Sequence, residues 1–434
     1  MNNNQEEEAV KALEESRDAF RSIDGLKLDD MPSAAAYAEA SAWEINALQP
    51  LGRFDEARKV GGDAMRVAGQ VIEKRPGHMT ALRARALTGD SLSGIEGFDL
   101  HTQEALALAT QAASDWEAVV KLDPSNQIAW NNVAAARQST AFWSWNLGQV
   151  RESLEQWRAG MSIEPHVRPS GMIGNTLGTT SGYRTMFEAD AGNRQAAEAA
   201  LADNRRLIQL AIRDLPPDSF GRNYFPEVVG YYGFPGSGVG YGGYAIPLAT
   251  GDYETLRSLA RASIKRIEQM KASEPQRELD KNRMLEVAYR TSAEASYRLK
   301  DYTAADADMK RALEIRQAIP KRNLFEERDA SDALMLAAMI EARMGRYSTA
   351  QQIIEPVLNF HRGLYMRKDN EDVSQRVQYA SALYVSALAA PGQKTAQLAQ
   401  AAAIIDALPP AMRRVSSVAV WRDRITEEQK KQRS

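Results

Sequence analysis

Residues able to carry chemistry are few in this chain and lack the spacing that chemistry requires. The chain of 434 residues has no cysteine, which excludes disulfides, thiolate nucleophiles and cysteine-ligated zinc. None of its four histidines has a second histidine at the H-x3-H or HExxH spacing of a zinc site. They are His78, His101, His166 and His361. No G-x-S-x-G serine motif occurs either. We therefore assign no metal ligand and no catalytic residue.

One glycine-rich stretch, residues 238–243, formally fits the G-x-G-x-x-G pattern of dinucleotide-binding sites. Such a site needs a β-strand before the glycines and a helix directly after them, within a βαβ unit. No strand pattern precedes these glycines, and Pro247 and several aromatic residues surround them. We interpret the match as chance and expect no cofactor.

An enzyme would need polar side chains gathered from several helices, and spacing along the sequence does not reveal such a cluster. Aspartate and glutamate on the inner faces of helices are able to do general acid–base work. No local motif supports that arrangement, so we expect a protein that binds rather than catalyses.

The strongest candidate for ligand contact is residues 218–247, where eight glycines and eight aromatic residues interrupt the surrounding helical pattern. Glycine allows unusual backbone angles, and tyrosine and phenylalanine provide large contact area at low entropic cost. The candidate ligand-binding residues in this insertion are Tyr224, Phe225, Tyr231, Tyr232, Phe234, Tyr241 and Tyr244. The alternative interpretation is a structural plug, in which these aromatic side chains pack on neighbouring helices.

Trp143 is a further candidate for ligand contact. It belongs to a group of aromatic residues in which Trp130 and Trp157 fall on apolar positions of their helices and are expected in the core. Trp143 lies off the apolar stripe that contains Trp145, so its side chain is a candidate for facing an open groove.

Residues 130–165 show which elements position these side chains. Apolar and small residues recur at steps of three and four from Trp130 to Trp145, which is typical of a helix. Gly148 then favours the left-handed cap that ends a helix. A second helix with Leu154 and Trp157 follows and stops at Pro165. Upstream, a helix from Met79 is expected to break around residues 94–97, with a partner over about 102–122.

Similar turns recur along the whole chain, as glycine or lysine followed two positions later by a residue that opens the next helix. The anchors are 52, 148, 192, 251, 300, 345 and 392, at intervals of 96, 44, 59, 49, 45 and 47 residues. The first interval equals two units of 48, and the interval of 59 contains the insertion. A period of about 47 residues of helix–turn–helix predicts an all-α fold, an α-solenoid of about eight stacked antiparallel helix pairs.

The unit resembles the tetratricopeptide repeat (TPR), whose pattern is W-x2-L-G-x2-Y, then A-x3-F, then P. Trp130-x2-Val133-Ala134-x2-Arg137 matches part of the first helix. Ala112-x3-Trp116 followed by Pro124 matches the second helix. The period exceeds the roughly 34 residues of the family, and several units lack its aromatic and proline positions. The resemblance covers about 32–407, and it implies scaffolding or the sensing half of a regulator.

Composition and the N-terminal sequence limit the classes of partner and the cellular compartment that we expect. The net charge of −3 argues against nucleic acid, because phosphate binding normally requires a basic excess. No run of about 18 apolar residues is present to span a membrane. The N-terminal sequence lacks the basic-then-apolar order of a secretory signal, so we expect a cytoplasmic protein. A signal removed beforehand would leave no trace, and nothing in the sequence predicts the oligomeric state.

We therefore divide the chain into an N-terminal helix (1–31), a first TPR-like array (32–217), the glycine- and aromatic-rich insertion (218–247) and a second array with a C-terminal capping helix (248–434). We expect a protein- or peptide-binding module that acts as a scaffold or regulatory adaptor. The alternative is a ligand-responsive sensor that binds a small molecule or short peptide near the insertion. The first predicts a stoichiometric protein partner and the second a deep aromatic pocket.

Overall fold

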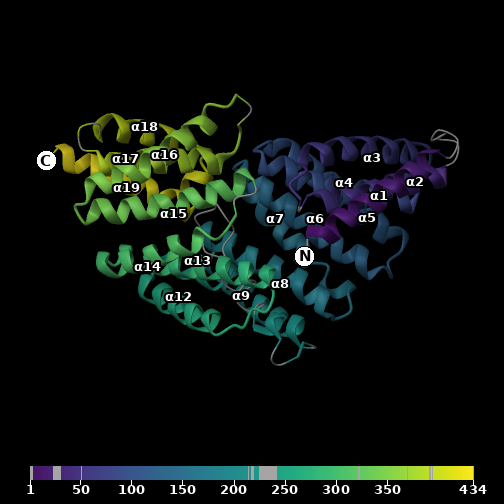
Figure 1. Cartoon of the computed structure of the whole chain (residues 1–434), viewed down its shortest axis with the longest axis horizontal. Helices are drawn as coiled ribbons and strands as arrows, with labels where there is room; N and C mark the ends of the chain where they lie inside the picture. Colours follow the sequence, from purple (N-terminus) through teal and green to yellow (C-terminus); the bar gives the residue numbers. More distant parts are fainter. Residues whose placement is uncertain are drawn as a thin grey trace. The chain divides into compact units, whose positions relative to one another are not determined.

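The computed structural model describes residues 3–22, 31–49, 51–213, 215–216, 219–223, 242–320, 323–368, 370–390, 392 and 394–433. All regular elements in these ranges are helices, so the predicted all-α class of stacked antiparallel helix pairs is confirmed (Figure 1). None of the helices in this part of the chain combines the length and the apolar character that crossing a bilayer requires.

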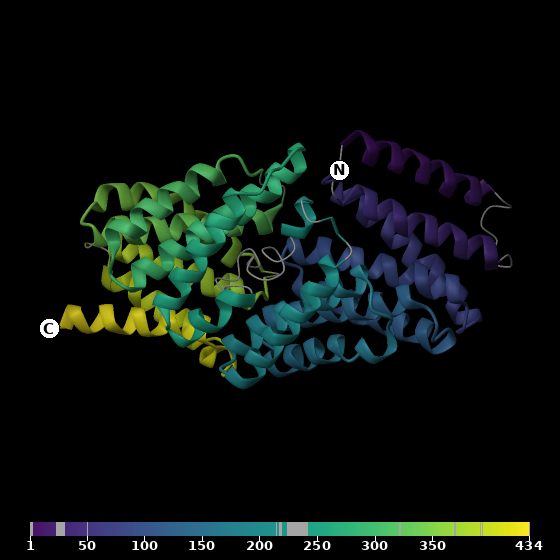
Figure 2. The ribbon, with the colours of Figure 1, turned by 90° about the horizontal axis from the view of Figure 1, so that it is seen from below.

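The chain divides into two compact units, and the first comprises Met1–Ser144 and Glu155–Arg168. Its helices are α1 (Asn3–Ser22), α2 (Met31–Leu48), α3 (Phe54–Lys74), α4 (Met79–Phe98), α5 (Thr102–Leu122), most of α6 (Gln127–Asn146) and the end of α7 (Val150–Met161), followed by the short η1 (Glu164–His166). From α1 to α5 each helix packs on its neighbour in sequence, as the purple pair α1 and α2 shows in Figure 2.

The second unit comprises Trp145–Leu154 and Pro169–Ser434. Its helices are α8 (Gly171–Asp190), α9 (Arg194–Ile212), η2 (Gly242–Tyr244), α11 (Ala245–Thr250), α12 (Tyr253–Glu268), α13 (Pro275–Arg298), α14 (Tyr302–Arg316), α15 (Leu324–Arg343), α16 (Tyr347–Tyr365), α17 (Val373–Ala389), α18 (Lys394–Asp406), η4 (Met412–Arg414) and α19 (Ser416–Arg433). In the pairs α8/α9, α13/α14, α15/α16 and α17/α18, the second helix packs against the first.

The turns within pairs are built alike, around one residue with a positive φ between 63° and 82°. These residues are Gly52, Leu100, Gly148, Gly192, Gly251, Lys300 and Gly345. After α8, the amide of Gly192 donates to the carbonyl of Ala189 at 3.0 Å and the amide of Asn193 to that of Glu188 at 2.8 Å. This is the Schellman arrangement, which satisfies the last carbonyls of a helix. Leu100 lies midway in the predicted interval of 96 residues, so the missing unit is present without a glycine.

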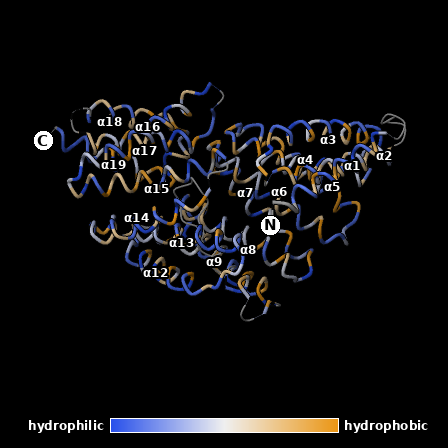
Figure 3. The backbone as a smooth tube through the Cα atoms, viewed as in Figure 1, coloured by the Kyte–Doolittle hydropathy of each residue, from blue (hydrophilic) through white to orange (hydrophobic). Residues whose placement is uncertain are grey.

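Small residues let the paired helices approach closely. Several alanines in these helices are fully buried, namely Ala112, Ala134, Ala305, Ala338 and Ala350. The loosely patterned segment after Pro165 forms α8, in which a side chain at Gly174 would meet the backbone nitrogen of Ala211 in α9 at 2.7 Å. Hydrophilic and hydrophobic residues are interspersed along the helices (Figure 3), and α3, α12 and α16 have a clear apolar side.

The predicted break around residues 94–97 is wrong, because α4 continues through these glycines to Phe98. The glycines serve packing instead. The indole ring of Trp143 lies so close to Gly97 that a side-chain carbon there would come within 2.1 Å of it. A glycine inside a helix weakens it by about 1 kcal/mol, which burial of the large Trp143 ring offsets.

Replacing Gly148 with alanine is expected to destabilise the second unit more than the same change at Gly345. Both residues have a positive φ, 78° and 77°, which costs about 1–2 kcal/mol for alanine. Only at Gly148 would the new carbon also meet neighbours, with Pro409 at 3.0 Å, and overpacking adds about 1–3 kcal/mol. Chemical denaturation of both variants measures the difference, and equal losses would contradict the close approach at Gly148.

Candidate functional site

The structure describes two of the eight predicted ligand-binding residues. Tyr224, Phe225, Tyr231, Tyr232, Phe234 and Tyr241 lie outside the described residues. The sensor hypothesis depends on them and stays a prediction. Tyr244 is 1% exposed and packs with Leu256, Ala260 and Ala295, in the core formed by α12 and α13. At Tyr244 the packing interpretation therefore accounts for the aromatic side chain.

Trp143 is 4% exposed and lies in the core between α4 and α6 rather than on an open surface. Its indole N–H donates to Oγ of Ser93 at 2.8 Å, and its ring meets that of Phe142 edge to face, with centroids 4.7 Å apart. The structure thus explains Trp143 by packing and by a satisfied hydrogen bond.

Replacing Gly97 with alanine is expected to displace the Trp143 ring and to destabilise the first unit by about 1–3 kcal/mol. The matched control is Gly62→Ala in α3, where a side-chain carbon would meet no atom within 4 Å. There the higher helix propensity of alanine is expected to stabilise by about 0.5–1 kcal/mol. Denaturation midpoints and tryptophan emission report both effects. A neutral Gly97→Ala variant would show that the ring position is not fixed by this contact.

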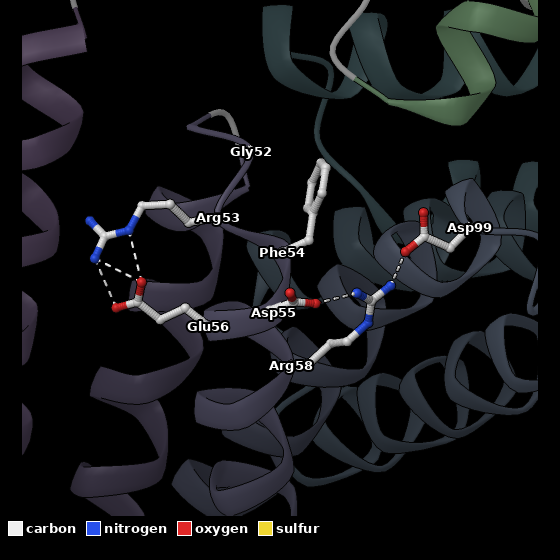
Figure 4. A pocket seen from close by; sticks show the side chains of 7 residues that line it. All are labelled: Gly52, Arg53, Phe54, Asp55, Glu56, Arg58 and Asp99. Carbon is white, nitrogen blue, oxygen red and sulfur yellow. Dashed lines mark hydrogen bonds and ion pairs between the residues drawn. The ribbon is translucent and has the colours of Figure 1, made fainter.

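A cavity of about 380 Å³ opens at the start of α3 and is lined by Gly52, Arg53, Phe54, Asp55, Glu56, Arg58 and Asp99 (Figure 4). Its charged groups already pair with one another. Arg53 bonds Glu56 at 2.8 Å, and Arg58 bonds Asp55 at 3.1 Å and also Asp99. The guanidinium and carboxylate groups therefore hold each other, and neither is positioned for an incoming ligand.

Glu96, His101 and Glu104 bring potential ligand atoms within 4.8 Å of one another at the same end of the first unit. Their spacing in the sequence does not match a known metal-binding motif. Glu96 is already occupied, because it lies 2.7 Å from Nδ1 of His101 and accepts from Nε of Arg58 at 2.7 Å. A cation would have to compete with that guanidinium, so we assign no metal to this group.

A buried network of charges joins α13, α14 and α15 in the second unit. The Asp329 carboxylate, 5% exposed, accepts from Arg290 at 2.9 Å and from Arg316 at 2.5 Å. Although burial opposes it, these two guanidinium groups hold the pKa of Asp329 below its usual value. Burial raises the pKa of the neighbouring Glu286 to about 7, against the attraction of Arg290.

Most of the network is hydrogen-bonded within the chain, although Oε1 of Glu286 and Nε of Arg316 are buried without a hydrogen-bond partner among the described residues. The half-buried Asp332 accepts from the Gln378 amide at 3.0 Å, which ties α15 to α17. Burial raises the pKa of Asp332 to about 6. A perturbed carboxylate in a cleft is a candidate acid or base. Here Asp329 and Asp332 accept hydrogen bonds from neighbouring helices, and Glu286 lies in ion-pair range of Arg290 and Arg316, so we interpret the network as one that aligns the helices.

The C-terminal helix α19 packs on α18, and its side chains also reach the first helices of three pairs in the second unit, α13, α15 and α17. Arg424 is its central contact. Its guanidinium donates to Glu294 of α13 at 3.2 Å and lies 4.0 Å from Sδ of Met339 in α15. It also lies over the Tyr297 ring at 5.6 Å and over the Trp421 ring at 4.5 Å. A guanidinium between a carboxylate and two aromatic faces is both paired and stacked.

A second contact lies one turn further along α19. The carboxylate of Glu428, 3% exposed, accepts from Arg343 of α15 at 2.8 Å and from Lys394 at the start of α18 at 3.0 Å. Burial alone would raise the pKa of Glu428, but hydrogen bonds from Lys431, Arg343 and Lys394 lower it to about 2. The Glu428 carboxylate is therefore ionised at any physiological pH and is hydrogen-bonded to these three side chains.

The beginning of α19 is held by α8. The backbone amide and the hydroxyl of Ser417 both donate to the Asp190 carboxylate, at 2.6 and 2.7 Å. A carboxylate at a helix N-terminus satisfies free amides and favours the helix dipole. Burial nevertheless raises the pKa of Asp190 to about 6. Further along, the Trp421 ring meets Tyr384 of α17 edge to face, with centroids 5.8 Å apart.

We call Glu294, Tyr297, Met339, Arg343 and Tyr384 the first-helix face, because all five lie on the first helices α13, α15 and α17. The face offers a carboxylate, a guanidinium group, two tyrosine rings and a thioether to an adjacent helix. We take it as the candidate functional site. Sequence reasoning missed it. Glu294 and Arg424 are separated by 130 positions, and no local pattern links them.

Neither the family models nor the curated proteins contain a match to this chain. Similar solved structures include a Rap protein complexed with Competence and Sporulation Factor, at 12% identity over 91% of this chain and 98% of that one, with a TM-score of 0.44. PilW, a type IV pilus biogenesis factor, is 16% identical over 66% of this chain and 96% of its own, with a TM-score of 0.34. The TPR domain of P58(IPK) is 13% identical over 90% and 99%, with a TM-score of 0.23.

The predicted repeat of paired antiparallel helices is confirmed by the helix order and packing of the described residues. What the similar proteins bind says nothing about the residues of this chain at such low identity. Function is therefore argued from the side chains of the second unit.

Proposed function

We propose that this chain is a non-catalytic helical-repeat protein that binds a segment of a partner protein on its first-helix face. One observation carries the proposal. The chain's own helix α19 is held on that face by contacts specific to its side chains, Arg424 with Glu294 and Tyr297, and Glu428 with Arg343. A surface that fits one helix in this way has the chemistry to fit another.

The chemistry of the first-helix face favours a protein partner. It places the carboxylate of Glu294 and the guanidinium of Arg343 on neighbouring helices, which suits a ligand with both signs of charge and opposes a polyanion. Truncating either partner of a desolvated ion pair is costly, so such pairs select one ligand and one register. These properties fit a scaffold or regulatory adaptor better than a catalyst.

The test compares three forms of the tagged full-length protein, each shown by circular dichroism to be folded. Arg343→Glu reverses a charge on the first-helix face, and Arg311→Glu reverses an exposed charge on α14, which serves as the matched control. We expect the wild type and Arg311→Glu to retain the same stoichiometric protein partner and Arg343→Glu to lose it. A partner held equally by all three forms would place binding elsewhere, and an enzymatic activity abolished by Arg343→Glu would contradict the non-catalytic assignment.

A further inference from the structure

Helix α19 is attached far less extensively than the helices it lies against. In α17, fourteen of 17 residues are buried. In α19, an 18-residue helix, burial is confined among the described side chains to Val418, Ile425 and Glu428. An element with few buried apolar contacts opens locally at a free energy below that of global unfolding. We therefore expect α19 to be the least stably docked of these helices.

Besides the buried Val418 and Ile425, α19 is held by polar contacts. Trp421, Arg424 and Glu428 occupy positions i, i+3 and i+7, which lie on one side of a helix. Two of the three are held through charges, by Glu294 and by Arg343 with Lys394. Removal of Arg424 would leave no orphan acid, because Glu294 also accepts from Arg298 at 2.6 Å. Glu294 would thus keep a partner if α19 left.

The segment before α19 is anchored independently of the helix. Met412 and Val415 are buried, and Pro409 and Met412 pack against the backbone at Gly148. Among the described residues, the only hydrogen bonds between the start of α19 and another helix are those from Ser417 to Asp190 of α8. Release of these bonds would let α19 leave while the preceding segment stays in place.

We propose that α19 is a displaceable occupant of the first-helix face, and that this face receives a partner helix with an aromatic residue, an arginine and a glutamate at positions i, i+3 and i+7. The inference rests on the proposed function. The two helices exclude each other, because Glu294 and Arg343 cannot engage a second arginine and a second carboxylate with the same geometry. Binding is therefore limited by the fraction of molecules in which α19 has left.

The experiment measures binding of a fluorescein-labelled peptide of residues 415–433 to the full-length protein by fluorescence anisotropy. In the wild type, the tethered α19 competes at a high effective concentration, so the peptide should bind weakly. Arg424→Ala weakens docking of the tethered helix and should tighten peptide binding at least tenfold. The control variant is Arg422→Ala, in which an exposed arginine of the same helix is removed and binding should match the wild type. A peptide with Arg424→Glu should not bind any form.

Two outcomes would overturn the inference. The first is no tighter peptide binding to Arg424→Ala when circular dichroism shows the variant folded. The second is equal tightening by Arg422→Ala. The proposed function fails in a different way, since the peptide would then bind Arg424→Ala as expected while no protein partner depends on Arg343. If Arg343→Glu loses the partner while the wild type and Arg424→Ala bind it equally, displacement of α19 is refuted and the proposed function is not.

Discussion

Replacing Asp329 with alanine is expected to lower the free energy of unfolding of the second unit by about 3–5 kcal/mol. The change removes the shared partner of Arg290 and Arg316, whose guanidinium groups lie 2.9 and 2.5 Å from the Asp329 carboxylate. Breaking a buried ion pair leaves a poorly compensated charge away from water, and here the change affects two guanidinium groups. Glu286 would be the remaining acid, 3.2 Å from Arg290 and 3.8 Å from Arg316.

The matched control is Glu314→Ala, which breaks the exposed pair between Arg311 and Glu314 on α14. Exposed pairs of this kind contribute between about 0 and 1 kcal/mol. Urea denaturation followed by circular dichroism compares the two variants with the wild type. Similar small losses in both would show that the Asp329 network is solvated and does not align α13, α14 and α15.

His361 is expected to make the fold less stable as the pH falls below about 6.5. Its imidazole is fully buried, with Oγ of Ser331 at 2.6 Å from Nε2 and the Gln375 amide at 3.1 Å from Nδ1. Burial, and then the positive charge of Arg328, lower the pKa of His361 to about 3. The unfolded chain binds this proton from pH 6.5 downward and the folded chain does not, so stability is lost across the window from 6.5 to 3.

The expected slope is about 1.4 kcal/mol per pH unit, which accumulates to an upper value of about 5 kcal/mol across the window. Carboxylates with raised pKa values act with the opposite sign. Asp190 and Glu286, with pKa values of about 6 and 7, add stability as the pH falls through those values. The overall curve therefore mixes both signs, and the contribution of His361 has to be taken as a difference.

That difference is the stability of the wild type minus that of His361→Gln, measured by denaturation between pH 4 and pH 7.5. Glutamine does not titrate, so its loss of packing shifts the curve without tilting it. We expect the advantage of the wild type to shrink steadily below pH 6.5. Parallel curves for the two proteins would mean that His361 takes up its proton in the folded state as readily as in the unfolded one.

The repeat could be predicted from the sequence because the residues that determine each turn are close together in the chain. Gly192 and Gly345 mark turns by a conformation that glycine adopts readily, and Lys300 was found from the small residues that follow it. Leu100 was not predicted as a turn residue, because a leucine in the sequence does not indicate a positive φ. Its place was recovered only from the even spacing of the other turns.

The candidate site could not be predicted for the same physical reason. Glu294, Arg343 and Arg424 are ordinary charged residues of amphipathic helices, and which of them meet depends on how pairs far apart in sequence stack. Aromatic composition singled out Trp143 and Tyr244, and burial explains both. Composition indicates which side chains can make large contacts, but burial in the core and exposure in a site use the same residue types.

Hydrogen exchange of the full-length protein is the most direct test of the central claim that the first-helix face is held by a displaceable helix. We expect the amides of α19 to exchange together and well before those of α17, and Arg424→Ala to accelerate exchange in α19 alone. The contrary result is exchange of α19 only together with α17, at the free energy of global unfolding. Helix α19 would then be a permanent part of the core, and the first-helix face would be closed to any partner.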